Sequence, residues 1–98
     1  MDYLLGLKDL LADKDKVWAH WEIDKKIVYT FDSKSANVSI TVDDGKPQVV
    51  RWESLCAGCI RIGDEVFMVE GETLECVEPR LTLKQVSKDS LLSTAASR

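Results

Sequence analysis

Two cysteines at Cys56-x-x-Cys59 are the side chains of this sequence whose type and spacing most directly suggest chemistry. A CxxC pair supplies two thiolates to a zinc knuckle, and it also forms the reactive pair of thioredoxin-like redox sites. Zinc would need two more ligands, and the remaining soft ligands are Cys76 and His20. Their irregular spacing, without a second knuckle or a βαβ context, favours buried structural thiols. We therefore expect no cofactor, and the alternative metal ligands are Cys56, Cys59, Cys76 and His20.

No other pattern in the chain predicts catalysis. His20 is the sole histidine and lies in a segment of alternating polarity. A catalytic histidine requires a nucleophile and an orienting acid that converge on it, and no spacing here predicts them. Glycine-rich phosphate loops and HExxH, GxSxG and EF-hand patterns are also missing. The sequence therefore predicts a protein that is not an enzyme and has no catalytic residues.

The acidity of the chain is concentrated in one segment. Residues 60–79 hold six acids against Arg61 alone, a local charge of −5, whereas the whole chain carries −4. Such a segment is typical of a solvated strand edge that discourages aggregation, or of a surface that steers a basic partner. In the second interpretation, an exposed Trp would anchor the contact. The partner-binding residues are then Glu70, Glu72, Glu75, Glu78 and Trp52.

The aromatic residues support a different interpretation, in which a barrel holds a small ligand. Alternation places Trp21, Tyr29 and Phe31 on a common face, and Phe67 falls in another apolar segment. Aromatic side chains supply large buried areas to small cores. An eight-stranded barrel is either filled by such side chains or encloses one ligand, as in calycin-like folds. In this alternative function the pocket residues are Trp21, Tyr29, Phe31 and Phe67.

Size and charge limit these interpretations. The 98 residues, 11.0 kDa in mass, suffice for one hydrophobic core. The net charge of −4 argues against nucleic acid as a partner, because phosphate binding needs a surplus of Lys and Arg. No apolar run approaches the roughly 20 residues that cross a bilayer, and the N-terminal region lacks the basic start of a signal peptide. Three cysteines, an odd number, indicate reduced thiols. We expect a cytoplasmic protein without a membrane partner.

A change of hydrophobic period defines the elements that position these residues. Leucines recur at helical spacing near the start, which predicts a helix over about residues 2–12 whose apolar face packs on the fold. From residue 17 to residue 86 the period is two, and turn residues separate short strands. The Asp-Asp-Gly-Lys run at 43–46 predicts a hairpin, because Asp-Gly tolerates positive φ. Residues 88–98 predict a tail or a short helix.

Short connections leave no room for crossover helices, so neighbouring strands must be antiparallel. The sequence predicts a mainly β fold in a single domain over residues 1–87. An antiparallel meander of seven to eight short strands forms a small barrel or curved sheet, with a short N-terminal α-helix. The favoured function is a small acidic protein-interaction module, similar in type to bacterial or phage inhibitor, immunity and adaptor proteins. Its partner would be a basic protein. A zinc-stabilised domain is the third alternative, and an exposed strand edge would allow a homodimer.

Overall fold

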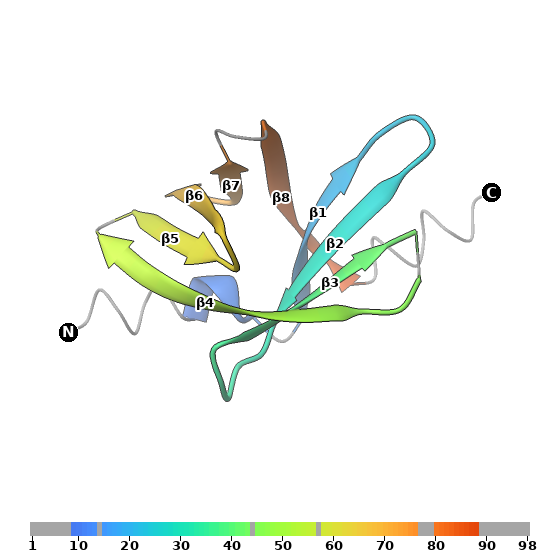
Figure 1. Cartoon of the computed structure of the whole chain (residues 1–98). Helices are drawn as coiled ribbons and strands as arrows, with labels where there is room; N and C mark the ends of the chain where they lie inside the picture. The colour runs from blue at the N-terminus through green and yellow to red at the C-terminus, as the bar shows by residue number, and fades with distance from the viewer. Residues whose placement is uncertain (1–8, 14, 44, 57, 77–79, 89–98) are drawn as a thin grey trace.

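The computed structural model describes residues 9–13, 15–43, 45–56, 58–76 and 80–88. In this part of the chain, eight antiparallel strands form a closed barrel in meander order (Figure 1). Each strand pairs with the next along the chain, and β8 pairs with β1. The predicted fold class is confirmed, and of its two forms the closed barrel is the one observed. The strands are β1 (Lys16–Trp21), β2 (Lys26–Phe31), β3 (Asn37–Val42), β4 (Gln48–Cys56), β5 (Cys59–Ile62), β6 (Glu65–Glu70), β7 (Thr73–Cys76) and β8 (Leu81–Ser87).

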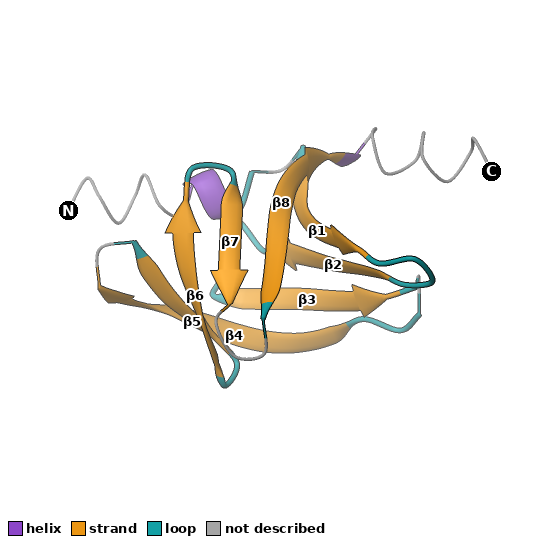
Figure 2. Cartoon of the chain, turned by 90° about the horizontal axis from the view of Figure 1, so that it is seen from above, coloured by secondary structure: helices purple, strands orange, loops and turns teal. Residues whose placement is uncertain are grey.

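The long, curved strand β4 joins the two sides of the barrel. Its first half pairs with β3 and its second half with β5, and the register shifts between Ser54 and Cys56. Such an irregularity bends a strand and increases its local twist. In Figure 2, β6, β7 and β8 cross β2 and β3 at a steep angle.

The barrel interior is filled by large side chains from alternate positions of the strands. Trp18 is opposite Tyr29 across β1 and β2, and both Trp18 and Phe67 have 0% of their surface exposed. The rings of Tyr29 and Phe67 meet edge to face with centroids 5.8 Å apart. Aromatic side chains bury large apolar areas, so these rings are a major source of the stability of the fold.

A short helical turn at residues 9–11 packs against one end of this core. Leu11 is buried in the core cluster. The indole N–H of Trp18 donates to the carbonyl of Leu11 at 3.0 Å, and the amide of Gln85 donates to the carbonyl of Leu10 at 2.7 Å. These bonds attach the turn to β1 and β8, the two strands that close the barrel. The rest of the predicted helix, over residues 2–8, and the predicted tail over 89–98 lie outside the described residues.

The observed turns lie where the sequence predicted them. Gly63 and Gly71 have φ values of 62° and 57°, a conformation that glycine adopts without steric cost. The turn at 43–46 also contains a positive φ, but at Asp43, with a value of 53°. The carboxylate of Asp43 accepts a hydrogen bond from the N–H of Lys26 at 2.8 Å. This bond attaches the β3–β4 turn to β2.

The inward face of β1 differs from the prediction. Alternation placed Trp21 with Tyr29 and Phe31, but Trp21 points outward and is 39% exposed. The tryptophan of β1 that reaches the core is Trp18, because residues directly opposite each other share a face and Trp18 is opposite Tyr29. Residues 17–19 are all buried. The apolar pattern of β1 therefore does not indicate which of its sides faces the interior.

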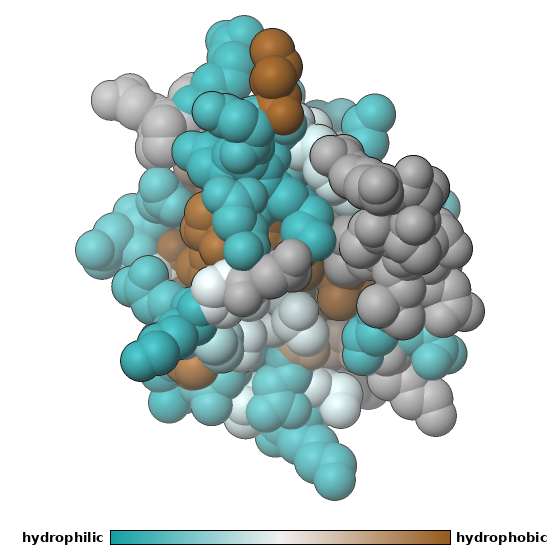
Figure 3. Space-filling model, turned by 90° about the vertical axis from the view of Figure 1, so that its right-hand side faces the viewer, coloured by the Kyte–Doolittle hydropathy of each residue, from teal (hydrophilic) through white to brown (hydrophobic). Residues whose placement is uncertain are grey.

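Closure of the sheet also removes the edge on which the expected homodimer depended. Because β1 pairs with β8, the described sheet has no terminal edge strand to pair with a second copy. The described residues on the side of the molecule in Figure 3 are mainly hydrophilic, with smaller hydrophobic areas between polar side chains. No helix in the described residues has the length and apolar character needed to cross a membrane.

The register of β1 predicts different outcomes for its two tryptophans. Trp18→Ala removes a fully buried ring, and we expect it to lower the free energy of unfolding by about 3–5 kcal/mol. Trp21→Ala, on the outer side of the same strand, should lower it by about 1 kcal/mol. Urea denaturation followed by circular dichroism measures both values. An equal loss in the two variants would contradict this register.

Candidate functional site

Strand β6 carries two exposed apolar side chains on its outward side. Phe67 is fully buried, so Val66 and Met68 on either side of it point outward, as the alternation predicts. The exposed fractions of Val66 and Met68 are 44% and 41%. Apolar side chains that gather on a surface are typical of contact sites. This part of β6 is therefore the apolar centre of a candidate binding surface.

Acidic side chains adjoin this apolar centre. Glu75 is directly opposite Met68 across β6 and β7, a relation that places Cβ atoms about 5 Å apart on one face. Glu70 is the last residue of β6 and Glu72 lies in the β6–β7 turn, and both are exposed. Within the described residues, no lysine or arginine forms an ion pair with any of these three glutamates. We define the acidic–apolar face as Val66, Met68, Glu70, Glu72 and Glu75.

Arg61 is the single base of the acidic segment, and it forms its ion pair with a residue outside that segment. Arg61 on β5 forms an ion pair with Glu53, which is directly opposite it on β4. An exposed pair of this kind contributes little to stability. It does balance the positive charge of Arg61, which is directly opposite Val66 on the neighbouring strand.

A surface pocket of about 380 Å³ surrounds the same ion pair. Its lining carries charges of both signs, two arginines and two acids, so the pocket has no excess charge for a phosphate group. The residues that line it are Arg51, Trp52, Glu53, Arg61, Gly63 and Asp64.

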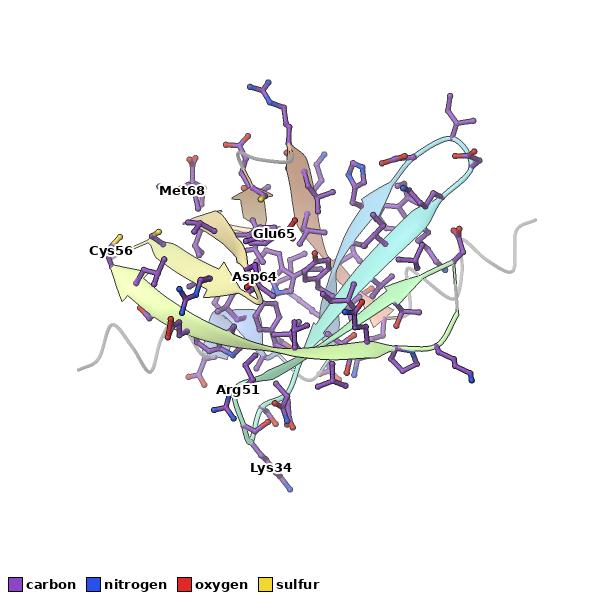
Figure 4. All side chains as sticks on the ribbon, viewed as in Figure 1. Lys34, Arg51, Cys56, Asp64, Glu65 and Met68 are labelled. Carbon is purple, nitrogen blue, oxygen red and sulfur yellow. The ribbon has the colours of Figure 1, made fainter. Side chains whose placement is uncertain are left out.

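The acidic segment, residues 60–79, occupies two regions of the molecule (Figure 4). Met68 lies with Cys56 on the flank formed by β4, β5 and β6, whereas Asp64 and Glu65 lie nearer the middle of the molecule. Glu65 is opposite the buried residue Ile62, so it points to the inward side of the sheet. Glu65 therefore points to the inward side of the sheet, where it stays partly exposed, and the glutamates of the acidic–apolar face lie on the outside.

The inward position of Glu65 affects Tyr29. Burial raises the pKa of Tyr29 to about 12, and the charges of Glu65 and Cys76 act in the same direction. The desolvated phenol remains protonated because its charged form would lie in the core beside other negative groups.

Trp52 is not the exposed anchor that the sequence predicted. Its ring packs against the core and meets Phe31 edge to face, with centroids 6.0 Å apart. The cause is the register of β4, since Trp52 is opposite the buried Ile62. Its indole nitrogen is buried and has no hydrogen-bond partner among the described residues. Glu78, the fourth predicted glutamate, lies outside those residues.

Val66 and Met68 supply the apolar part of the site, and the sequence analysis did not assign them to binding. Period-two alternation shows that they share a side of β6. It does not show whether another element covers that side. Their exposure becomes visible only in the folded barrel.

The alternative metal ligands are not brought together. Cys76 is buried on the inward side of β7, whereas Cys59 lies on the outward side of β5. His20 is held at a third place, where Nδ1–H donates to the carbonyl of Thr82 at 3.1 Å and Nε2 lies 3.3 Å from the Glu22 carboxylate. Across the part of the chain that the structure describes, no three His, Cys, Asp or Glu residues form a metal-binding group. These four residues therefore do not form the zinc site that the third alternative requires.

The residues of the alternative ligand pocket are core residues, with the exception of Trp21. Tyr29, Phe31 and Phe67 are buried, and their rings contact other aromatic rings. A ligand at this level of the barrel would have to displace side chains that stabilise the fold.

Comparison with known proteins identifies no relative from which a function could be transferred. No family model, no curated protein and no solved structure matches this chain. The function is therefore inferred from the described residues and their geometry.

The burial of Tyr29 predicts a loss of stability in alkaline solution. Its pKa is about 12 in the folded protein, against the ordinary value of 10.0. Between these values the unfolded chain has released the phenolic proton and the folded chain has not, so the free energy of unfolding falls as the pH rises. The total loss is about 2–3 kcal/mol, since one pKa unit corresponds to about 1.4 kcal/mol.

Chemical denaturation between neutral and strongly alkaline pH measures this loss. Tyr29→Phe cannot ionise at this position and should show a shallower decline over the same range. If Tyr29→Phe and the wild type decline equally, the stability loss does not come from Tyr29.

Proposed function

We propose that this protein is a non-enzymatic interaction module that binds a basic protein partner through its acidic–apolar face. The observation that carries the proposal is the juxtaposition of Met68 and Glu75, an exposed apolar side chain and an exposed carboxylate directly opposite each other on neighbouring strands. Methionine is enriched in protein interfaces, and polar groups typically surround their apolar centre. The acidic–apolar face has both features within one hairpin.

The charge of this face defines the chemistry of the partner. Glu70, Glu72 and Glu75 form no ion pair with described lysines or arginines, and Arg61 already pairs with Glu53. A partner with lysine or arginine side chains around an apolar contact would match this arrangement. Complementary charge raises the rate of association and selects against acidic partners, while burial of Val66 and Met68 contributes affinity.

The backbone of the acidic–apolar face is held in one conformation by strand pairing. Met68 and Glu75 project from paired strands of a closed barrel, so their backbone is already ordered before a partner arrives. Binding to such a surface costs less conformational entropy than ordering a loop. The biological role that fits this surface is occlusion, inhibition or adaptation of the partner.

Reversal of one charge tests the proposal. Affinity capture from the native host first supplies the partner, and calorimetry then measures its affinity for the wild type and for Glu75→Lys. We expect Glu75→Lys to weaken binding at least about tenfold, or roughly 1.4 kcal/mol, because it places a cation beside Met68 and opposite a basic surface. The weaker complex should also depend less on salt concentration.

Asp24→Lys is the matched control. Asp24 is exposed in the connection between β1 and β2, away from the acidic–apolar face, and its reversal changes the net charge by the same amount. We expect Asp24→Lys to bind like the wild type. Equal affinity of the wild type and Glu75→Lys, or equal weakening by both reversals, would exclude this face as the binding site.

A further inference from the structure

Cys56 and Cys59 occupy directly opposite positions on the hairpin formed by β4 and β5. Opposite residues of an antiparallel pair have Cα atoms about 4.5–5.5 Å apart, and their side chains share a face. A disulfide requires Cα atoms about 4.4–6.8 Å apart. The backbone therefore holds the two sulfur atoms where a bond between them can form without a change of strand pairing. Neither cysteine is in a disulfide in this structure.

The end of the hairpin is attached to the rest of the sheet. Gly58, between the two cysteines, has a φ of 76°, and its carbonyl accepts a hydrogen bond from the N–H of Val69 at 2.9 Å. Cys59 is also opposite Met68 of β6 in the ladder. These contacts limit the freedom of the hairpin and keep the two thiols near each other.

The two thiols differ in access to solvent. Cys56 is exposed, whereas Cys59 is buried. Burial raises the pKa of the Cys59 thiol, and a hydrogen bond with the Cys56 side chain raises it further. A reagent in solution therefore reaches the Cys56 sulfur first. Cys59 is positioned to react second, with the sulfur of Cys56.

We propose that Cys56 and Cys59 form a reversible dithiol site whose substrates are small disulfides of the glutathione type. Cys56 releases its proton to solvent, and its thiolate attacks one sulfur of the substrate disulfide. This step forms a mixed disulfide on Cys56 and expels one substrate thiolate, which takes up a proton. The thiolate of Cys59, formed by loss of its proton to solvent, then attacks the Cys56 sulfur and expels the second substrate thiolate, which takes up a proton. Two electrons pass from the protein dithiol to the substrate, which leaves as two thiols.

The geometry also indicates that the bond is easily reversed. Opposite Cβ atoms in a sheet are about 4.5–5.5 Å apart, whereas a disulfide prefers about 3.5–4.5 Å, so the strands must approach slightly to form the bond. Strained and exposed disulfides are the readily reduced ones. Excess reduced glutathione should therefore restore both thiols by the reverse exchange.

Cys76 serves as the internal control for this chemistry. It is buried in the core cluster on the inward side of β7, where a disulfide reagent cannot reach it without unfolding. The site does not rest on the proposed function, because no glutamate of the acidic–apolar face takes part in the exchange. Failure of the exchange would leave the partner-binding proposal unaffected, and failure of the charge-reversal experiment would leave the exchange unaffected.

The experiment incubates the full chain with oxidised glutathione and then blocks remaining thiols with an alkylating reagent for mass spectrometry. We expect the wild type to lose two hydrogen atoms and to retain one alkylatable thiol under denaturing conditions. Tryptic cleavage after Arg51 and Arg61 places both cysteines of the pair in one peptide, residues 52–61, which should carry the loss. The Cys76→Ser variant should lose the same two hydrogen atoms in this peptide but retain no alkylatable thiol.

Two variants test the order of attack. Cys59→Ser should stop at a single glutathione adduct on Cys56, because the thiol that resolves the mixed disulfide is gone. Cys56→Ser should form no disulfide within the peptide and should gain adduct far more slowly. A disulfide that includes Cys76, a stable adduct on the wild type, or the absence of an adduct on folded Cys59→Ser would overturn the proposal. Mapping of the wild-type peptide decides the pairing even if a variant does not fold.

Discussion

The whole barrel relies on the pairing of β1 with β8. Residues 16–19 pair with residues 84–87, and this ladder joins the first and last strands of the meander. Closure gives the sheet an inside, into which each strand must direct one of its two sides. The same strands donate the hydrogen bonds that hold the helical turn, from Trp18 to Leu11 and from Gln85 to Leu10. Barrel closure, the aromatic core and the N-terminal turn therefore support one another.

Closure makes the outer side of the sheet as continuous as the inner side. Cys59, Met68 and Glu75 are neighbours on three adjacent strands, although up to 16 residues separate them in the chain. Adjacent strands lie about 4.8 Å apart, so these side chains form one row. The proposed dithiol site thus lies beside the apolar centre of the acidic–apolar face, while each site uses different atoms and different chemistry.

The acidic segment illustrates how register assigns roles to residues of one type. Glu65 is opposite Ile62 and acts on the buried Tyr29, whereas Glu75 is opposite Met68 and remains at the surface. Both are glutamates in adjacent strands, and they differ only in the side of the sheet to which they point. An inward carboxylate raises the pKa of a neighbouring phenol, and an outward one attracts a basic partner.

Features that depend on neighbouring residues could be predicted from the amino-acid pattern. Period-two alternation and turn residues such as Gly63 and Gly71 predicted short antiparallel strands, and the charge count located the acidic segment. Alternation also placed Val66 and Met68 together on one side of β6.

The side of each strand that faces the interior became known from the folded barrel. The fold placed Trp18 in the core and Trp21 outside, and it turned Trp52 toward Phe31. Alternation groups the residues of a strand into two sides. Where both sides carry apolar residues, the choice between them depends on pairing with strands that are distant in the sequence, and no local pattern records that pairing.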